Sequence, residues 1–313
     1  MLHVCVSTDK NYETMTKMCM YDIITRKNKD TEITFYVLVD QFDGASIAEF
    51  NEIEGITVNL IHANSQEMLP TIDMSHLHST RLGITKATYL RFLIPSLPQF
   101  QNIRRILYID CDFLARRDIS GIYNAYIDDL ALGMVRDTFY IRFENLKEQM
   151  MRDGAGYNAG LMLMDLPRLR KLNFTDMGLY ISAVNNYNDQ TTINRAFRDE
   201  IYQLDPINQI PIHNLVQHIP RMGDIREWNN FHETKYKSIE EIVDRSYFWH
   251  FHESKGWQMQ IKILHDLFYF SLNRLMKYEA THHVEWMDPE LDQKINEDFK
   301  RAISADGSTN CAY

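Results

Sequence analysis

Two carboxylates separated by one residue, Asp110 and Asp112, follow an apolar run at residues 106–109. Residues two apart on an extended chain point to the same side, so both carboxylates can face one ion. Hard oxygen ligands suit Mg²⁺ or Mn²⁺, which also bind substrate phosphates. Such an ion can neutralise the charge of a leaving phosphate group. Taken alone, the pair fits a helix cap or a turn equally well, so the surrounding pattern decides its meaning.

Strand-like and helix-like segments alternate around this pair. Strands are expected at residues 3–7, 34–40, 56–61 and 103–109, and helices at residues 12–24 and 85–94. This alternation predicts an α/β fold with a mainly parallel central sheet flanked by helices. The second and fourth of these strands are apolar on both faces, as expected where helices cover both sides. Ligands collect outside the carboxyl ends of strands in such sheets, which is where Asp110 lies.

The second half of the chain is less regular. Strands are expected at residues 131–135, 160–164 and 248–252, and a helix at residues 189–197. A helical pattern begins at residue 259 and includes an acidic stretch, residues 288–298, that reads as a surface helix. The α/β part should therefore be followed by a helical C-terminal extension.

The composition excludes several classes of partner. The 313-residue chain has a formal net charge of −10, so it repels polyanions, and neither nucleic acid nor acidic lipid is expected as a general partner. Its four cysteines form no Cys-x-x-Cys pair, which suits a reducing, cytoplasmic compartment and argues against a zinc ribbon. We expect no signal peptide and no membrane span, so any membrane contact should be peripheral.

Six segments, taken in order, resemble glycosyltransferase family 8, the retaining transferases that include bacterial lipopolysaccharide galactosyl- and glucosyltransferases and glycogenin. The segments are Val6-Ser7-Thr8-Asp9-Lys10-Asn11-Tyr12, Thr88-Tyr89-Leu90-Arg91-Phe92, Asp110-Cys111-Asp112, Tyr157-Asn158-Ala159-Gly160-Leu161, Asp189-Gln190-Thr191-Thr192-Ile193-Asn194 and His250-Phe251-His252-Glu253-Ser254-Lys255-Gly256-Trp257. The last segment departs from the family pattern, because it is one residue shorter, lacks the internal glycine and has Gly256 in place of proline.

The resemblance implies a GT-A type nucleotide-binding fold and a UDP-sugar donor, UDP-glucose or UDP-galactose, used with Mn²⁺ or Mg²⁺. It implies a catalytic domain over residues 1–257, with a nucleotide-sugar half at 1–115 and an acceptor and sugar half at 116–257, followed by the extension at 258–313. The acceptor would be a glycan or glycoconjugate. The acidic C-terminal end differs from the basic, aromatic tails of related lipopolysaccharide enzymes.

The resemblance also assigns residues to the donor site. The metal would be held by Asp110, Asp112 and His250. The remaining donor contacts would come from Ser7, Asp9, Asn11 and Tyr12 at the nucleoside, Arg91 and Lys255 at the diphosphate, Cys111 between the two metal-binding carboxylates, and Asn158, Ala159 and Gly160 at the sugar. A zinc site built from His250 and His252 is the less favoured reading, because the other ligands are hard carboxylates.

Gln190 would lie at the anomeric centre of the donor sugar. Retention through a covalent intermediate needs a carboxylate close to the anomeric carbon, and an amide is a poor nucleophile. Asp189 and Asp137 are the neighbouring acids. A front-face route is therefore favoured, in which Gln190 and Asp189 shield the positively charged centre while the acceptor hydroxyl enters on the side that the diphosphate leaves.

Structural and functional alternatives remain. Asp9 could cap the helix that starts near Tyr12, Asp189 could be an N-cap, and Asn158 and Gly160 could be turn residues. A phosphatase of the haloacid-dehalogenase type also uses Asp-x-Asp after a strand, but the chain has no matching later acidic motif at Gly223-Asp224. A nucleotide-sugar sensor on the same fold is a non-enzymatic alternative.

Overall fold

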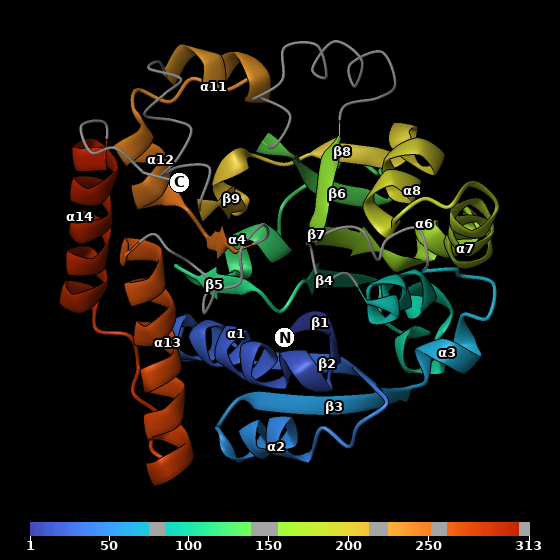
Figure 1. The fold of residues 1–313 in the computed structure, drawn as a ribbon, viewed down its shortest axis with the longest axis horizontal. Coiled ribbons are helices and arrows are strands. Elements are labelled where there is room, and N and C mark those ends of the chain that lie inside the picture. Colours follow the sequence, from blue (N-terminus) through green and yellow to red (C-terminus); the bar gives the residue numbers. More distant parts are fainter. Residues whose placement is uncertain (75–84, 139–155, 213–224, 252–261, 307–313) are drawn as a thin grey trace.

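The computed structural model describes residues 1–74, 85–138, 156–212, 225–251 and 262–306. Within these residues a seven-stranded mixed sheet, in the order β3-β2-β1-β4-β7-β6-β8, forms the centre of the molecule (Figure 1). A three-stranded sheet, β5-β10-β9, lies beside it. The strands are β1 Leu2–Asp9, β2 Ile33–Asp40, β3 Ile56–Ala63, β4 Arg105–Ile109, β5 Phe113–Ala115, β6 Leu132–Arg136, β7 Tyr157–Asp165, β8 Ile201–Gln203, β9 Ile210–Pro211 and β10 Phe248–His250.

Helices cover both faces of the large sheet. The α-helices are α1 Glu13–Arg26, α2 Ala45–Ala48, α3 Ser65–Met68, α4 Ser120–Tyr123, α6 Leu166–Lys171, α7 Phe174–Asn185, α8 Asp189–Ala196, α11 Ile225–His232, α12 Ile239–Arg245, α13 Lys262–Thr281 and α14 Pro289–Asp306. The 3₁₀ helices are η1 Lys10–Tyr12, η2 Glu49–Glu52, η3 Lys86–Ser96, η4 Pro98–Phe100, η6 Arg198–Glu200 and η7 Pro206–Asn208. The predicted α/β class and the helical C-terminal extension are both confirmed.

The central strands alternate their side chains between two hydrophobic cores. In β2, Phe35, Val37 and Val39 pack on the side of α1, α12 and α13, whereas Tyr36 and Leu38 pack on the side of η3, α6 and α7. Every residue of β2 is buried. This is the reason that the strand reads as apolar on both faces in the sequence.

The direction of the strands brings distant segments to one edge of the sheet. β1 pairs in parallel with β2 and β4, so the carboxyl ends of β1 and β4 lie at the same edge. β7 runs antiparallel to β4, with Ile109 opposite Leu161, so the beginning of β7 reaches that edge too. The backbone N–H of Asp110 donates to the carbonyl of Gly160 at 2.8 Å and continues this ladder past the end of β4.

The small sheet joins the edge of the large sheet to the C-terminal helices. β10 pairs antiparallel with β5, which places His250 opposite Phe113, and it pairs in parallel with β9. Trp249 of β10 packs against Phe299 of α14 at a centroid distance of 4.6 Å. Figure 1 shows α13 and α14 along one side of the molecule, next to α1 and α12.

Most predicted elements appear within a few residues of their expected bounds, with two informative differences. Residues 85–94 were expected to be helical, and they form the 3₁₀ helix η3, which contains Pro95 and runs to Ser96. β7 begins at Tyr157, earlier than predicted, so Asn158 and Gly160 belong to a strand and their reading as turn residues is wrong. In the described part of the chain, no helix is long and apolar enough to span a membrane.

Candidate functional site

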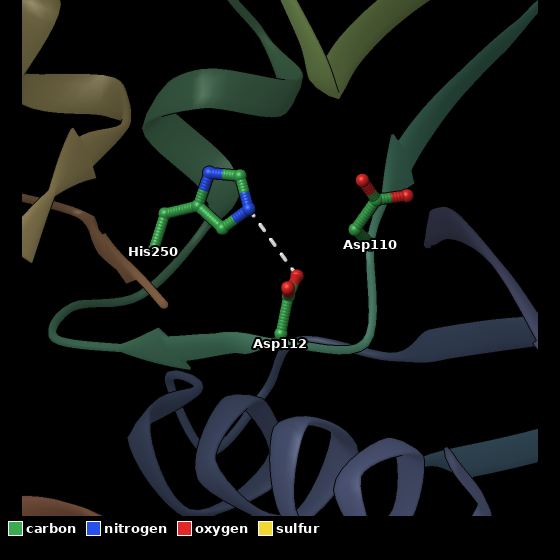
Figure 2. Close-up of side chains that lie close together, drawn as sticks. All are labelled: Asp110, Asp112 and His250. Atoms are coloured by element: carbon green, nitrogen blue, oxygen red, sulfur yellow. Dashed lines mark ion pairs between the residues drawn. The ribbon is translucent and has the colours of Figure 1, made fainter. Parts of the chain in front are cut away.

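Asp110, Asp112 and His250 come together although they lie far apart in the chain. One ligand atom from each lies within 4.8 Å of the others. Figure 2 shows the two carboxylates and the imidazole facing one space, from the end of β4, the turn before β5 and the end of β10. His250 Nε2 is 3.2 Å from Asp112 Oδ1, and the His250 ring stacks on Phe113 at a centroid distance of 4.1 Å. The stacking fixes the plane of the imidazole.

The donor set and the space around it fit a divalent cation. Two carboxylate oxygens and one imidazole nitrogen are ligands that Mn²⁺ accepts, and carboxylates also suit Mg²⁺. Gly160 leaves this space open, because a Cβ there would lie 2.9 Å from His250 Cε1 and 3.1 Å from Asp110 Oδ2. Burial and the carboxylate of Asp112 both raise the pKa of Asp110, while Arg91 opposes the shift. A cation at this point would relieve the repulsion between the two carboxylates.

Arg91 is buried and bound to four protein groups. Its Nη2 donates to Asp110 Oδ1 at 2.7 Å, and its Nη1 lies 2.8 Å from Asp189 Oδ2. Its Nη1 also donates to the carbonyl of Ala159 at 2.7 Å, and its Nε donates to the carbonyl of Thr88 at 2.8 Å. The guanidinium therefore orients two carboxylates and one strand of the site, and it is not a mobile surface cation.

Asp110 receives a second hydrogen bond from its own strand. The hydroxyl of Tyr108 donates to Asp110 Oδ1 at 2.9 Å, and the ring of Tyr108 lies under the Arg91 guanidinium at 4.6 Å. One oxygen of Asp110 is thus fixed by protein donors. The other, Oδ2, borders the space beside Gly160 that His250 Cε1 also borders.

Two of the three predicted catalytic residues, Gln190 and Asp137, belong to one hydrogen-bonded group. Gln190 Nε2 donates to Asp137 Oδ2 at 2.9 Å, and Gln190 Oε1 accepts the backbone N–H of Ala159 at 3.1 Å. Asn158 Nδ2 donates to the same Asp137 oxygen at 3.1 Å. Asp137, at the end of β6, therefore holds together side chains from β7 and α8.

Asp189 was weighed as the N-cap of its helix, and that reading is wrong. The N-cap of α8 is Asn188, whose side chain accepts from the backbone N–H of Thr191 at 2.7 Å. Asp189 is the first helical residue, is 5% exposed and pairs with Arg91. A negative charge in the first turn of a helix is also favoured by the helix dipole.

Sequence reasoning missed one buried residue of this group, Gln209. It is 1% exposed, and its Nε2 donates to Asn158 Oδ1 at 2.5 Å. The same nitrogen lies 3.0 Å from His250 Nδ1. Because an amide nitrogen only donates, Nδ1 accepts in this arrangement and Nε2 of His250 carries the proton toward Asp112. No sequence signal marks Gln209, since it lies in an irregular segment between η7 and β9.

The end of β1 supplies the predicted nucleoside-binding residues. Asp9 Oδ1 accepts the backbone N–H of Asn11 at 2.9 Å, so Asp9 is the N-cap of the short 3₁₀ helix η1. It does not cap α1, the helix that was expected to start near Tyr12. Ser7 Oγ donates to the carbonyl of Ala87 at 3.2 Å and so ties β1 to η3. Tyr12 follows as the N-cap residue of α1. The loop is next to the carboxyl end of β4, because β1 and β4 are adjacent parallel strands.

Cys111 and Lys255 are the remaining residues predicted to contact the donor. Cys111, between the two carboxylates, is buried and forms no disulfide within the described residues. It belongs to the short turn that connects β4 with β5. Lys255 lies outside the described residues, as does His252.

Comparison with known proteins identifies the family of this chain. The model of the family "Glycosyl transferase family 8" matches residues 3–260. General stress protein A of Bacillus subtilis is 27% identical over 217 residues, which cover 66% of this chain and 72% of that protein. A putative glycosyltransferase of Haemophilus influenzae is 28% identical, with 64% of this chain and 60% of that protein covered. Lipopolysaccharide 1,2-glucosyltransferase of Escherichia coli is 24% identical, with 62% and 57% covered. The chain thus spans less than two thirds of the last two relatives.

Solved structures share the fold. The galactosyltransferase LgtC, in complex with donor and acceptor sugar analogues, superposes with a TM-score of 0.67 at 19% identity, covering 94% of this chain and 100% of that one. The glycosyltransferase GlyE of Streptococcus pneumoniae gives a TM-score of 0.58 at 17% identity, with 96% and 64% covered. The central sheet and its flanking helices therefore have the GT-A arrangement of these enzymes.

Proposed function

The chain belongs to glycosyltransferase family 8 and is a sugar-transferring enzyme, and we propose that it is a retaining hexosyltransferase. In this proposal it moves glucose or galactose from a UDP-sugar to a glycan or glycoconjugate acceptor. The observation that carries the proposal is the cluster of Asp110, Asp112 and His250 at the carboxyl edge of the sheet. Relatives named as a glucosyltransferase and a galactosyltransferase support a hexose donor.

The proposed donor site follows the edge from β1 to β10. Asp110, Asp112 and His250 would hold Mn²⁺, or Mg²⁺, and a bound ion would stabilise the charge on the leaving diphosphate. The nucleoside would lie against Ser7, Asp9, Asn11 and Tyr12. The sugar would lie against Asn158, Ala159 and Gly160, whose strand borders both the carboxylates and Gln190. Cys111 would contact the donor from the turn between the two carboxylates, and Lys255 would contact the diphosphate.

The contacts of the three predicted catalytic residues favour a front-face route. Gln190 is held at both ends of its amide, by Ala159 and by Asp137. Asp189 is paired with Arg91. Asp137 accepts two amide donors on one oxygen, which lowers its nucleophilicity. None of the three is therefore poised as a covalent nucleophile, and their proposed role is to stabilise positive charge at the anomeric carbon.

A donor panel tests this function directly. Release of UDP from UDP-glucose and UDP-galactose should depend on Mn²⁺ and stop with a chelator. Asp112→Asn should lower the rate on the order of 100-fold or more, because it removes one charged ligand. Asp128→Asn, at an exposed turn before β6, is the matched control and should leave the rate unchanged. Binding of UDP-sugar without any release of UDP would instead support a sensor.

The proposed place of action is the cytoplasm. Among the described residues, Cys5, Cys19 and Cys111 are buried and form no disulfide. Cysteines outside any disulfide suit a reducing compartment. We also propose residues 1–257 as the catalytic domain and 258–313 as an extension that braces it, since Trp249 of β10 packs on Phe299 of α14.

A further inference from the structure

Gln209 connects two parts of the site that no sequence motif joins. It precedes β9, the strand that pairs with β10, and β10 carries His250. The single amide of Gln209 contacts His250 Nδ1 at 3.0 Å and Asn158 Oδ1 at 2.5 Å. One side chain thus touches both a candidate metal ligand and a candidate sugar contact.

The contact to Asn158 continues into the catalytic group. Asn158 Oδ1 also accepts the backbone N–H of Gly160 at 2.9 Å, which holds the amide in one orientation. Asn158 Nδ2 donates to Asp137, and Asp137 accepts from Gln190. A buried chain of hydrogen bonds therefore leads from His250 through Gln209 to Gln190. Networks of this kind act as rigid units when their members are satisfied.

One polar atom in this series of hydrogen bonds, Gln209 Oε1, needs a separate account. Among the described residues, Gln209 Oε1 is buried and has no hydrogen-bond partner. Leaving a buried carbonyl oxygen unpaired is costly, so its retention calls for an explanation. A histidine that binds a metal through Nε2 carries its proton on Nδ1 and donates it to an oxygen of a neighbouring group. Gln209 is the group at Nδ1, where it now presents Nε2. A rotation of its amide that keeps Nε2 on Asn158 Oδ1 would bring Oε1 to Nδ1 as the acceptor.

We propose that Gln209 is a positioning residue of the metal centre, which orients the His250 ring and ties it to Asn158 in the sugar site. The inference rests on the proposed function, because it assumes that His250 binds the metal. Loss of the Gln209 side chain should loosen the imidazole and free the Asn158 amide together. Metal affinity and the KM for the donor should then change with one substitution.

The test measures metal binding without turnover. Mn²⁺ is titrated into the protein with UDP present, and free Mn²⁺ is followed by electron paramagnetic resonance. Gln209→Leu keeps the volume but removes the amide, and it should weaken Mn²⁺ binding by about 10- to 100-fold. The matched control is Gln203→Leu, which removes a half-buried amide that donates to the His232 carbonyl at 2.7 Å, away from the metal centre. It should leave Mn²⁺ binding unchanged.

A second variant separates the hydrogen bonds of the Gln209 side chain from the volume that it fills. Gln209→Glu offers only oxygens, so it can accept the Nδ1 proton but cannot donate to Asn158. Mn²⁺ affinity should stay within about threefold of the wild-type value, while the KM for the UDP-sugar should rise. Equal loss of Mn²⁺ affinity in Gln209→Glu and Gln209→Leu would overturn the inference.

The remaining outcomes distinguish the inference from its premise. If the wild-type protein binds Mn²⁺ and Gln209→Leu binds it equally well, only the role of Gln209 is wrong. If the wild-type protein binds no Mn²⁺, or His250→Ala binds it as well as the wild type, the proposed metal centre fails and the role of Gln209 fails with it. Should Gln209→Leu not fold, Gln209→Asn, which is one methylene too short to reach both partners, is judged by the same criterion.

Discussion

Arg91 donates from Nη2 to Asp110 Oδ1 at 2.7 Å, in the interior of the protein and at the edge of the candidate metal centre. The same guanidinium pairs with Asp189 at 2.8 Å, the residue next to Gln190. The three nitrogens of a planar guanidinium reach two carboxylates and two carbonyls here, a spread of donors that the compact ammonium of lysine cannot match. Arg91 therefore links the metal-binding and catalytic halves of the site from within the protein.

Replacing the guanidinium of Arg91 by the single ammonium of lysine should lower both the stability of the protein and its affinity for Mn²⁺. Arg91→Lys should lower the free energy of unfolding by about 2 kcal/mol, because several buried acceptors lose their donors. It should also weaken Mn²⁺ binding, since Asp110 loses its orientation. Chemical denaturation and Mn²⁺ titration measure the two effects. Arg168→Lys is the control, because Arg168 pairs with Glu200 in a more exposed place, with 41% of its side chain accessible. Equal losses in both variants would contradict the central role of Arg91.

Gly160 should be intolerant of even one methyl group. In Gly160→Ala the Cβ would lie 2.9 Å from both Asn158 Oδ1 and His250 Cε1. Displacement of either side chain should weaken Mn²⁺ binding by at least about tenfold. Gly121→Ala is the control, because its Cβ would meet the Tyr247 hydroxyl outside the site. Calorimetry with Mn²⁺ should show weakened binding in Gly160→Ala alone, and normal binding in that variant would show that the space is not used.

Loss of the Gln190 side chain should lower the rate of sugar transfer and leave the affinity for Mn²⁺ unchanged. Gln190→Ala leaves the Ala159 N–H and Asp137 without their amide partner. We expect kcat to fall on the order of 100-fold through loss of charge stabilisation, with Mn²⁺ affinity nearly unchanged. Gln293→Ala removes an exposed amide that bonds Glu297 on α14, and it should transfer sugar at the wild-type rate. Full transfer activity in Gln190→Ala would remove Gln190 from the mechanism.

His232 should make the protein sensitive to acid. Burial, aided by Arg136, lowers its pKa from 6.5 to about 3, and neither ring nitrogen has a hydrogen-bond partner among the described residues. Between these pH values the unfolded chain binds a proton that the folded chain does not, so stability falls as the pH falls. The loss is about 1.4 kcal/mol per pH unit below 6.5.

His232→Leu should therefore be at least as stable as the wild type at pH 7, because it removes two unpaired buried nitrogens. Its free energy of unfolding should also fall less between pH 7 and pH 5. Urea denaturation at the two pH values measures the difference, and subtracting the wild-type change cancels the contribution of the carboxylates. The same pH dependence in both proteins would show that His232 does not remain neutral in the folded state.

The C-terminal extension should be anchored by one acidic residue. Asp292 of α14 lies 2.9 Å from Arg116 and 3.2 Å from Arg26, two largely buried arginines. Asp292→Asn should destabilise the protein by about 2 to 3 kcal/mol, because it leaves buried positive charge uncompensated. Asp298→Asn, on the same helix in an exposed pair with Arg301, should cost less than about 1 kcal/mol. Thermal unfolding compares the two, and equal shifts would argue against the anchor.

Local pattern in the sequence was sufficient for the fold class and for the chemical types at the site. Alternation and apolar runs report which side chains are buried, so they located β1, β2, β4 and α1 within a few residues. The Asp110 and Asp112 pair at a strand end was enough to suggest an ion. Irregular segments gave no comparable signal, and the early start of β7 was missed because Tyr157 and Asn158 carry no alternating pattern.

Only the tertiary structure decided which residues meet. The antiparallel course of β7 brings Gly160 beside Asp110, and the β5–β10 pair brings His250 beside Asp112. The double pairing of Arg91 and the two contacts of Gln209 join segments that are remote in the chain. Hydrogen bonds of this kind depend on chain topology and on distances of a few tenths of an ångström, and neither quantity is written in the local order of residues.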